Sequence, residues 1–366
     1  MMIKPASSAC NLACTYCFYR DSAAKRAVPD RGFMTDAVTE AIIAKCLEEA
    51  EHCSFMFQGG EPTLAGLPFF RRFVLTVNRL NEVRRRTVSY AFQTNGLVLD
   101  RDWANFFREN RFLVGVSFDG TARLHDLHRK DGAGDGSARR VLRSISLLKE
   151  QGVEFNILSV VTPAMADNAR PVWDFFKGRG LPFLQFIPAI DPFGEEPGAG
   201  SASLSPDAYA RFLMQLFDLW YESLSSGKGV SVRFFDNLVS MLAGYPPESC
   251  DMAGVCSVQY VAESDGSIYP CDFYCTDEYL LGNILEASIV ELDARRKKMQ
   301  FVETSPNTDR ECLECRWRPL CRGGCKRWRN GGVYRFCSAM KQFFPYAIER
   351  LERVAGSIRR QDLNGH

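Results

Sequence analysis

The spacing of the cysteines is the feature that most constrains this chain. Fourteen cysteines occur among its 366 residues, with three inside residues 10–17 and nine between Cys250 and Cys337. The N-terminus has no apolar segment typical of a secretory signal, and no stretch reaches the roughly 18 apolar residues of a membrane span. We therefore expect a cytoplasmic protein without a membrane partner. In that reducing compartment, the thiols are expected to be metal or cluster ligands rather than disulfides.

Composition excludes several other classes. The chain is 46% hydrophobic and 24% charged, as in ordinary globular proteins. Its formal net charge of +1 gives no electrostatic reason to bind nucleic acid or an anionic surface. Only four histidines are present, so histidine-based catalysis or metal binding is poorly supplied.

The first half alternates short apolar runs with longer amphipathic segments. Runs rich in β-branched and aromatic residues predict strands. The predicted strands are 2–7, 53–57, 88–93, 112–118, 153–161 and 182–187, and the predicted helices are 35–51, 67–83, 101–110, 137–151, 168–178 and 206–226. Thr35 and Asp100 are typical helix starts, and Gly152 and Gly180 typical ends. This alternation predicts an α/β fold with a parallel sheet.

About six such units are enough for an open, partial (β/α)6 barrel, in which the active site lies at the carboxyl ends of the strands. Several unusual sequences fall at those ends: the first three cysteines, 58–62, 93–96 and 117–120. We expect one composite site there. The predicted domains are residues 1–240, with a linking helix near 205–226, and residues 241–366, which are cysteine-rich and end in a helix.

The first cysteine group is Cys10-x3-Cys14-x2-Cys17. Iron–sulfur clusters are held by cysteine thiolates, and three ligands on a four-iron cluster leave one iron open for a substrate. Tyr16, Phe18 and Tyr19 would shield such a site from water. The alternatives are a zinc knuckle or incidental core cysteines, but no histidine lies near enough to complete a local zinc site.

This spacing, followed by an aromatic residue, resembles the radical S-adenosylmethionine family. The resemblance implies that the open iron holds the amino and carboxylate groups of S-adenosylmethionine. The predicted cosubstrate contacts are Tyr16, Gly59, Gly60, Glu61, Ser117 and Arg139. In the family, the Gly-Gly-Glu-Pro motif contacts the methionine amino group and a serine hydrogen-bonds the cosubstrate. Arg140 is an alternative to Arg139 for the carboxylate.

The second cysteine group lies in the C-terminal third. Cys256 and Cys271 flank a predicted β-hairpin with its turn at residues 264–266. A compact set of thiols follows, namely Cys312, Cys315, Cys321, Cys325 and Cys337. Spacing alone leaves zinc and iron–sulfur clusters equally favoured.

Together these spacings resemble the SPASM domain of radical enzymes that modify proteins and peptides. The resemblance implies two auxiliary [4Fe–4S] clusters and therefore three in all. The implied ligands are Cys250, Cys256, Cys271 and Cys325 for one, and Cys312, Cys315, Cys321 and Cys337 for the other. Cys275 departs from the pattern, either as a bystander thiol or as a substitute ligand.

The segments at 5–10, 17–21, 57–66 and 271–274 resemble the anaerobic sulfatase-maturating enzymes, over residues 3–345. That resemblance implies oxidation of a cysteine or serine in a target sulfatase to Cα-formylglycine, by 5′-deoxyadenosyl radical abstraction of a β-hydrogen. It implies a substrate with a C-x-P-x-R or S-x-P-x-R motif and a low-potential electron donor such as flavodoxin or ferredoxin. Asp272 matches the family's catalytic aspartate and is the predicted base; from residue type alone it could equally be a turn aspartate. Tyr19 would line the radical pocket or serve packing.

Two other functions stay open at this point. One is a SPASM enzyme that forms a thioether, carbon–carbon crosslink or epimer in a ribosomally made peptide; many of these carry an N-terminal recognition domain, for which Cys10 leaves no room. The other is a non-catalytic zinc or iron–sulfur module, which would not need a three-cysteine open site.

Overall fold

The computed structural model describes residues 1–225 and 229–364, with side chains to residue 357. The chain forms two compact units that interleave in sequence. The first unit comprises Met1–Phe118, His125–Asn156 and Val258–Phe301, and the second comprises Asp119–Leu124, Ile157–Ser257 and Val302–His366.

The first unit is built on a sheet in which the N-terminal strand is central. β1 pairs in parallel with β2 on one side and with β8 on the other. Parallel pairing continues from β2 to β3 and β4, whereas β8, β9 and β10 pair antiparallel. The strands are β1 (Met2–Ile3), β2 (His52–Phe57), β3 (Thr87–Thr94), β4 (Phe112–Ser117), β8 (Val261–Ala262), β9 (Ser267–Tyr269) and β10 (Gly282–Asn283).

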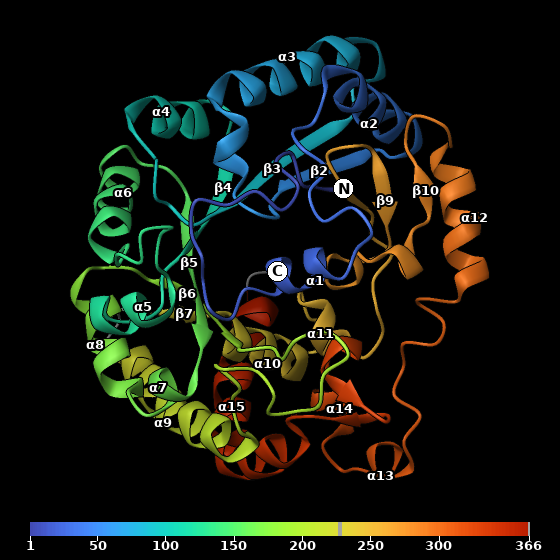
Figure 1. The fold of residues 1–366 in the computed structure, drawn as a ribbon. Coiled ribbons are helices and arrows are strands. Elements are labelled where there is room, and N and C mark those ends of the chain that lie inside the picture. The colour runs from blue at the N-terminus through green and yellow to red at the C-terminus, as the bar shows by residue number, and fades with distance from the viewer. Residues whose placement is uncertain (226–228, 365–366) are drawn as a thin grey trace. The chain divides into compact units, whose positions relative to one another are not determined.

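Helices follow the strands of this unit, and Figure 1 shows α2 and α3 beside β2 and β3. The core between them is aromatic: the ring of Phe57 lies 5.1 Å from that of Phe70 and 4.9 Å from that of Phe73. The helices that contribute to the unit are α1 (Phe18–Ala24), α2 (Asp36–Glu49), α3 (Leu67–Arg84), α4 (Arg101–Glu109), α5 (Ala122–His128), α6 (Ala138–Glu150) and α12 (Ile289–Met299), with short 3-10 turns at Pro62–Ala65, Asp272–Tyr274 and Asp277–Tyr279.

The second unit combines parallel strands with a helical layer. β6 pairs in parallel with both β5 and β7. Phe217 on α9 packs against Phe235 on α10 and Phe343 on α15, with ring centroids 5.3 and 5.7 Å apart. The elements are β5 (Phe155–Val161), α7 (Pro163–Ala166), α8 (Ala169–Gly178), β6 (Phe183–Pro188), α9 (Pro206–Ser225), β7 (Ser231–Val232), α10 (Arg233–Ala243), α11 (Cys250–Ala253), α13 (Arg310–Leu313), α14 (Arg318–Cys321), a 3-10 turn at Lys326–Trp328, β11 (Arg329–Asn330), β12 (Val333–Tyr334) and α15 (Cys337–Asn364).

The predicted strands and helices of the first half are confirmed to within a few residues, except that the first strand is shorter than 2–7. The Thr35 side chain accepts a hydrogen bond from the Val38 amide and the Asp100 side chain one from Trp103, so both cap helices as predicted. The hairpin at 264–266 is also present. The division at residues 240 and 241 stays a prediction, since the two compact units are cut elsewhere.

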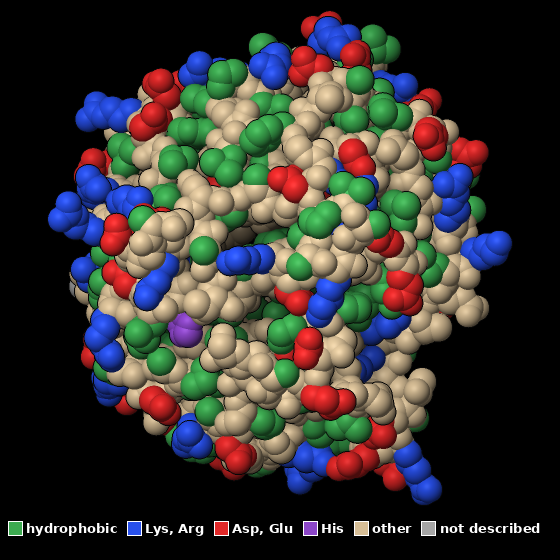
Figure 2. All heavy atoms as spheres, viewed as in Figure 1, with side chains coloured by type: hydrophobic (Ala, Val, Ile, Leu, Met, Phe, Trp, Pro, Cys, Tyr) green, Lys and Arg blue, Asp and Glu red, His purple; other side chains and the backbone are tan. Residues whose placement is uncertain are grey.

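Surface charge and helix composition add two observations. Acidic and basic side chains are interspersed over the face seen in Figure 2. Within the described part of the chain, no helix is at once long and apolar enough to cross a membrane.

Candidate active site

The first three cysteines lie on the loop between β1 and α1. Cys17 directly precedes α1, and its amide donates to the carbonyl of Cys14 at 3.3 Å. Cys10 is exposed, and Cys14 and Cys17 are half-buried. Although Cys10 is exposed as a residue, desolvation by the surrounding protein raises the pKa of its thiol to about 12, and the nearby Glu61, Cys14 and Cys17 raise it too. The loop therefore presents three neighbouring thiols, which must lose protons to bind iron.

Gly60 lets this loop sit close to the end of β2. Its amide donates to the Ser7 carbonyl at 3.0 Å, and the Glu61 amide donates to the Ala9 carbonyl at 2.7 Å. A Cβ atom at Gly60 would lie only 2.1 Å from the Ala9 carbonyl oxygen. Because Gly60 has no side chain, the cysteine loop can pack directly against it. A contact of Gly60 with the cosubstrate stays a prediction.

Glu61 is buried and its carboxylate is already well supplied with donors. Oε1 accepts hydrogen bonds from the Thr63 amide, the Thr63 hydroxyl and the Thr94 hydroxyl, at 3.1, 2.7 and 2.8 Å. Oε2 accepts one from the Asn95 amide at 2.7 Å. Burial raises the pKa of Glu61, and these hydrogen bonds oppose that rise. Each carboxylate oxygen has about two lone-pair sites. Since Oε2 accepts only the bond from Asn95, one of its two sites remains for the predicted ammonium.

Asp272 lies at the start of the 3-10 turn that follows β9, and it is also buried. Its Oδ2 accepts hydrogen bonds from the Tyr19 hydroxyl at 2.6 Å and from Gln58 Nε2 at 2.7 Å. Gln58 Nε2 also lies 2.7 Å from the Tyr19 hydroxyl oxygen. On the other side, Lys4 Nζ lies 3.1 Å from Oδ1. The structure therefore brings the predicted base to Tyr19, two residues after the cysteine loop.

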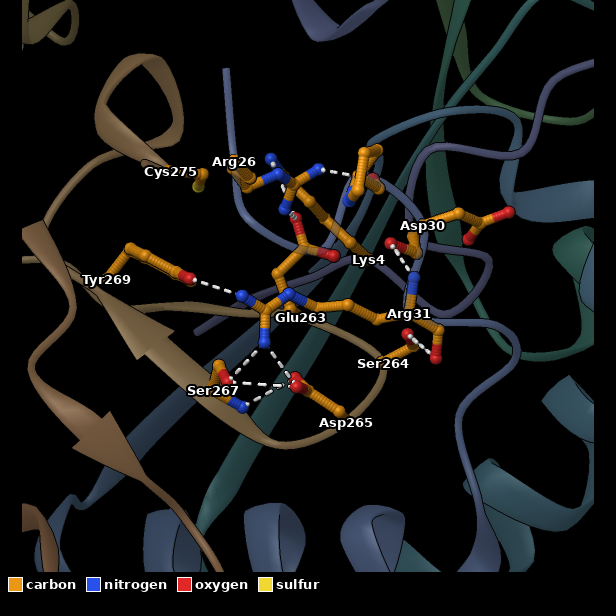
Figure 3. A network of polar contacts seen from close by, with 12 residues as sticks. Lys4, Arg26, Asp30, Arg31, Glu263, Ser264, Asp265, Ser267, Tyr269 and Cys275 are labelled. Carbon is orange, nitrogen blue, oxygen red and sulfur yellow. Dashed lines mark hydrogen bonds and ion pairs between the residues drawn. The ribbon is translucent and has the colours of Figure 1, made fainter. Parts of the chain in front are cut away.

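Lys4, the partner of Asp272, belongs to a buried network of charges with Arg26 and Glu263, which Figure 3 shows. Glu263 Oε1 lies 2.6 Å from Arg26 Nη1 and 3.6 Å from Lys4 Nζ. Burial alone would raise the pKa of Glu263, but the charges of Lys4 and Arg26 bring it below its usual value. Burial opposes the charge of Lys4, yet Cys275, Asp272 and Glu263 together raise its pKa above the usual value. The positive charges of Lys4 and Arg26 thus balance the negative charges of Glu263 and Asp272 where water is excluded.

The remaining predicted cosubstrate residues occupy different environments. Ser117 is nearly buried at the end of β4, and its hydroxyl accepts a hydrogen bond from Gln93 at 3.1 Å. Tyr16 packs against the His128 ring, with centroids 5.4 Å apart. Arg139 is exposed on the first turn of α6, whereas Arg140 pairs with Asp131. Their roles toward the cosubstrate stay predictions.

In the second unit, seven predicted ligands fall into two groups. Burial raises the pKa of Cys325 to about 12, with further contributions from Cys250 and Cys256. Burial likewise raises the pKa of Cys321 to about 11, and Cys337, Cys312 and Cys315 add to it. The assignment of these cysteines to two clusters stays a prediction, and so does the role of Cys271, which belongs to the first unit.

The donor sets fit iron–sulfur clusters by their chemistry, because they consist of cysteine thiols outside any disulfide and include no histidine. Among the side chains of residues 1–225 and 229–357, no three His, Cys, Asp or Glu are arranged as ligands of a single metal ion. Cys275 is fully buried beside Val261 and Tyr269, and its thiol donates to the Cys271 carbonyl at 3.6 Å. This packing favours the bystander interpretation of Cys275.

Sequence reasoning missed Lys4, Arg26 and Glu263. The available signal was charge in apolar surroundings: Lys4 follows the apolar pair Met2-Ile3, and Glu263 follows the apolar run Val261-Ala262. Lysine and glutamate are almost never fully buried unless they are paired. Two such residues directly after short apolar strands therefore predict partners, although not which ones.

Known proteins resemble this chain over nearly its whole length. Residues 5–171 match the Radical SAM superfamily. The cysteine-type anaerobic sulfatase-maturating enzyme of Clostridium perfringens (strain 13 / Type A) is 44% identical, over 98% of this chain and 99% of that protein. The serine-type anaerobic sulfatase-maturating enzyme of Bacteroides thetaiotaomicron is 30% identical, over 99% and 92%. A solved structure of native anSMEcpe with bound AdoMet and Cp18Cys peptide superposes with a TM-score of 0.92 at 44% identity, over 98% of each chain. This chain therefore belongs to the anaerobic sulfatase-maturating enzymes of the radical S-adenosylmethionine superfamily.

Proposed function

We propose that this enzyme oxidises a cysteine of a target sulfatase to Cα-formylglycine and that Asp272 is its general base. The observation that carries the proposal is the hydrogen bond from the Tyr19 hydroxyl to Asp272, which joins the acid to the segment that follows Cys17. A base beside the three-cysteine loop suits a reaction in which a hydrogen atom and a proton leave the same side chain. Closer identity to a cysteine-type than to a serine-type relative favours cysteine as the target.

As a member of this family, the enzyme uses S-adenosylmethionine and three [4Fe–4S] clusters. Cys10, Cys14 and Cys17 are the proposed ligands of the cluster that binds S-adenosylmethionine, and the remaining predicted cysteines are those of the auxiliary pair. When bound, these groups supply reductive cleavage of S-adenosylmethionine to a carbon radical that removes one hydrogen atom, and an acceptor for the electron left on the substrate. All other steps fall to the chain's own side chains.

Asp272 accepts the thiol proton at its carboxylate. Tyr19 and Gln58 donate to Oδ2 and so fix the plane of the carboxylate relative to the cysteine loop. The target cysteine thus loses one hydrogen atom from Cβ, one proton from sulfur and one electron, which leaves a thioaldehyde. Water then replaces sulfur to give the aldehyde and hydrogen sulfide. A general base placed in this way contributes about 10²-fold to 10⁴-fold to the rate.

The substrate is proposed to be a protein or peptide, since the related anSMEcpe was solved with a bound peptide. We propose a sulfatase with a C-x-P-x-R motif, and a flavodoxin or ferredoxin as the low-potential electron donor. A peptide-crosslinking or epimerising SPASM enzyme is the second candidate, and the same experiment separates the two.

The test uses the full chain, reconstituted anaerobically with iron and sulfide. It is incubated with S-adenosylmethionine, dithionite and one of three peptides, which carry the motif C-x-P-x-R, S-x-P-x-R or A-x-P-x-R. Mass spectrometry is expected to show the aldehyde on the cysteine peptide, less of it on the serine peptide and none on the alanine peptide. Deoxyadenosine formation with all three peptides unchanged would contradict the proposal and favour another peptide substrate.

A further inference from the structure

We propose that Lys4 is a positioning residue that fixes the direction of the Asp272 carboxylate. The inference rests on the base role of Asp272 proposed above and adds a residue from the start of the chain to it. It is drawn from three features of the structure: the contacts of the two carboxylate oxygens, the path of the Lys4 side chain and the way its ammonium is anchored.

The two oxygens of Asp272 are held from opposite sides. Tyr19 and Gln58 both donate to Oδ2, at 2.6 and 2.7 Å. Oδ1 is buried and has no hydrogen-bond donor among the described residues, so its partner is the ammonium of Lys4 at 3.1 Å. Without Lys4, Oδ1 of the base would be buried and unpaired, and only the two donors to Oδ2 would oppose rotation of the carboxylate about its bond to Cβ.

The chain makes room for Lys4 at Gly59. This glycine has φ +118°, and a Cβ atom there would lie 2.8 Å from Lys4 Cγ and 3.0 Å from Lys4 Cβ. The methylene stem of Lys4 therefore runs directly across the end of β2, beside Gln58. A side chain at position 59 would push the stem away and the ammonium with it. Gly59, the first glycine of the Gly-Gly-Glu-Pro motif, thus leaves the space that the Lys4 side chain occupies.

The ammonium is anchored on the side away from Asp272. Glu263 lies 3.6 Å from Lys4 Nζ and is itself held by Arg26 at 2.6 Å (Figure 3). Lys4 Nζ also lies 4.9 Å from the centre of the Tyr19 ring, within the range of a cation–π contact. With only 3% of Lys4 exposed, water does not compete for it. Lys4 is therefore fixed before the substrate arrives, as a positioning group needs to be.

The experiment compares Lys4→Met and Lys4→Arg with the unaltered enzyme. Each reconstituted protein receives the cysteine peptide, S-adenosylmethionine and dithionite. Formylglycine is counted by mass spectrometry, deoxyadenosine by chromatography, and iron per chain by a colorimetric assay. Lys45→Met is the matched control, since Lys45 is a partly buried lysine of the same unit that donates to the carbonyls of Ile284 and Ala287 instead.

Lys4→Met is expected to lower the ratio of formylglycine to deoxyadenosine by roughly 10-fold to 100-fold, the cost of a misplaced catalytic group. Its iron content should match that of the unaltered enzyme. Lys4→Arg should recover most of the ratio, because it keeps a cation of similar length, and Lys45→Met should leave the ratio unchanged. The ratio is taken per deoxyadenosine, so it does not depend on how much enzyme carries a cluster.

A ratio for Lys4→Met within about twofold of the unaltered enzyme would overturn the proposal. So would loss of iron and of deoxyadenosine formation in both Lys4 variants, since that result would make Lys4 a purely structural residue. Failure of the proposed function is distinguishable: there the unaltered enzyme itself would make deoxyadenosine but no formylglycine.

Discussion

Asp272 is the acid of its region whose hydrogen-bond donors, Tyr19 and Gln58, lie next to the cysteine loop and the Gly-Gly-Glu-Pro motif. Replacing Asp272 with Asn keeps the size of the side chain but removes the proton acceptor. The ratio of formylglycine to deoxyadenosine should then fall by about 10²-fold or more, measured by mass spectrometry of the peptide. Asp277→Asn is the control, because Asp277 accepts from the Ala27 amide at 2.7 Å and is half exposed. Equal turnover by Asp272→Asn would remove Asp272 from the mechanism.

Gly60 is the second position at which a single residue decides the site. Gly60→Ala would place Cβ against the Ala9 carbonyl, so the cysteine loop must move. We expect a loss of about 1–3 kcal/mol in the free energy of unfolding, seen as a lower thermal midpoint together with less iron per chain. Gly178→Ala is the matched control, since its Cβ would meet nothing within 4 Å. A Gly60→Ala protein with a normal midpoint and full iron would show that the loop adapts.

At the scale of elements, local pattern and long-range pairing differ in how far sequence predicts them. β2 alternates exposed and buried residues, and α3 has aromatic residues at helical spacing on its buried face. Both elements can therefore be predicted from a short stretch of sequence. The pairing of β1 with β8 leaves no such trace, because each strand has only two residues. Sequence analysis therefore predicted Cys10, Asp272 and Tyr19 as separate features of one site, while the Lys4–Asp272 ion pair and the buried Glu263 came from the structure alone.

α12 gives a prediction about pH. Asp293 on this helix accepts from Lys297, Tyr260 and Arg296, and these contacts lower its pKa to about 2, mainly through Lys297. A lowered pKa in the folded state stabilises the protein above the unfolded pKa of about 3.8, and this stabilisation is lost as pH falls toward about 2. The thermal midpoint of Asp293→Asn should therefore lie below that of the unaltered protein at pH 6, and the gap should narrow as pH falls from 5 toward 3. A gap independent of pH would mean that the charge of Asp293 contributes nothing.

At the scale of the whole molecule, the first unit and the region around the last cysteines differ in how much secondary structure can keep each of them folded without clusters. The first unit has a continuous sheet backed by long helices, whereas the region around the last cysteines relies on α13 and α14 of four residues and on two-residue strands. Elements this short are not stable by their own hydrogen bonds. Removal of iron with a chelator should therefore speed protease cleavage within residues 302–336 by roughly tenfold or more, while fragments containing β2 to β4 persist. Mass spectrometry of the fragments decides, and equal cleavage rates with and without iron would contradict this.

The place of β1 between β2 and β8 has a consequence for the order of events during synthesis. β1 is synthesised before both of its partners, and one of them, β8, is made only after residue 260. Tyr19 and Asp272 likewise meet across 253 positions of sequence. Contacts between residues so far apart in sequence form late in folding. The intervening chain must first lose conformational entropy, and the free energy gained from the contact offsets that loss only once the contact has formed. The cysteine loop and its base are therefore expected to come together only once most of the chain has been translated, so that an unfinished chain lacks the base that completes the oxidation.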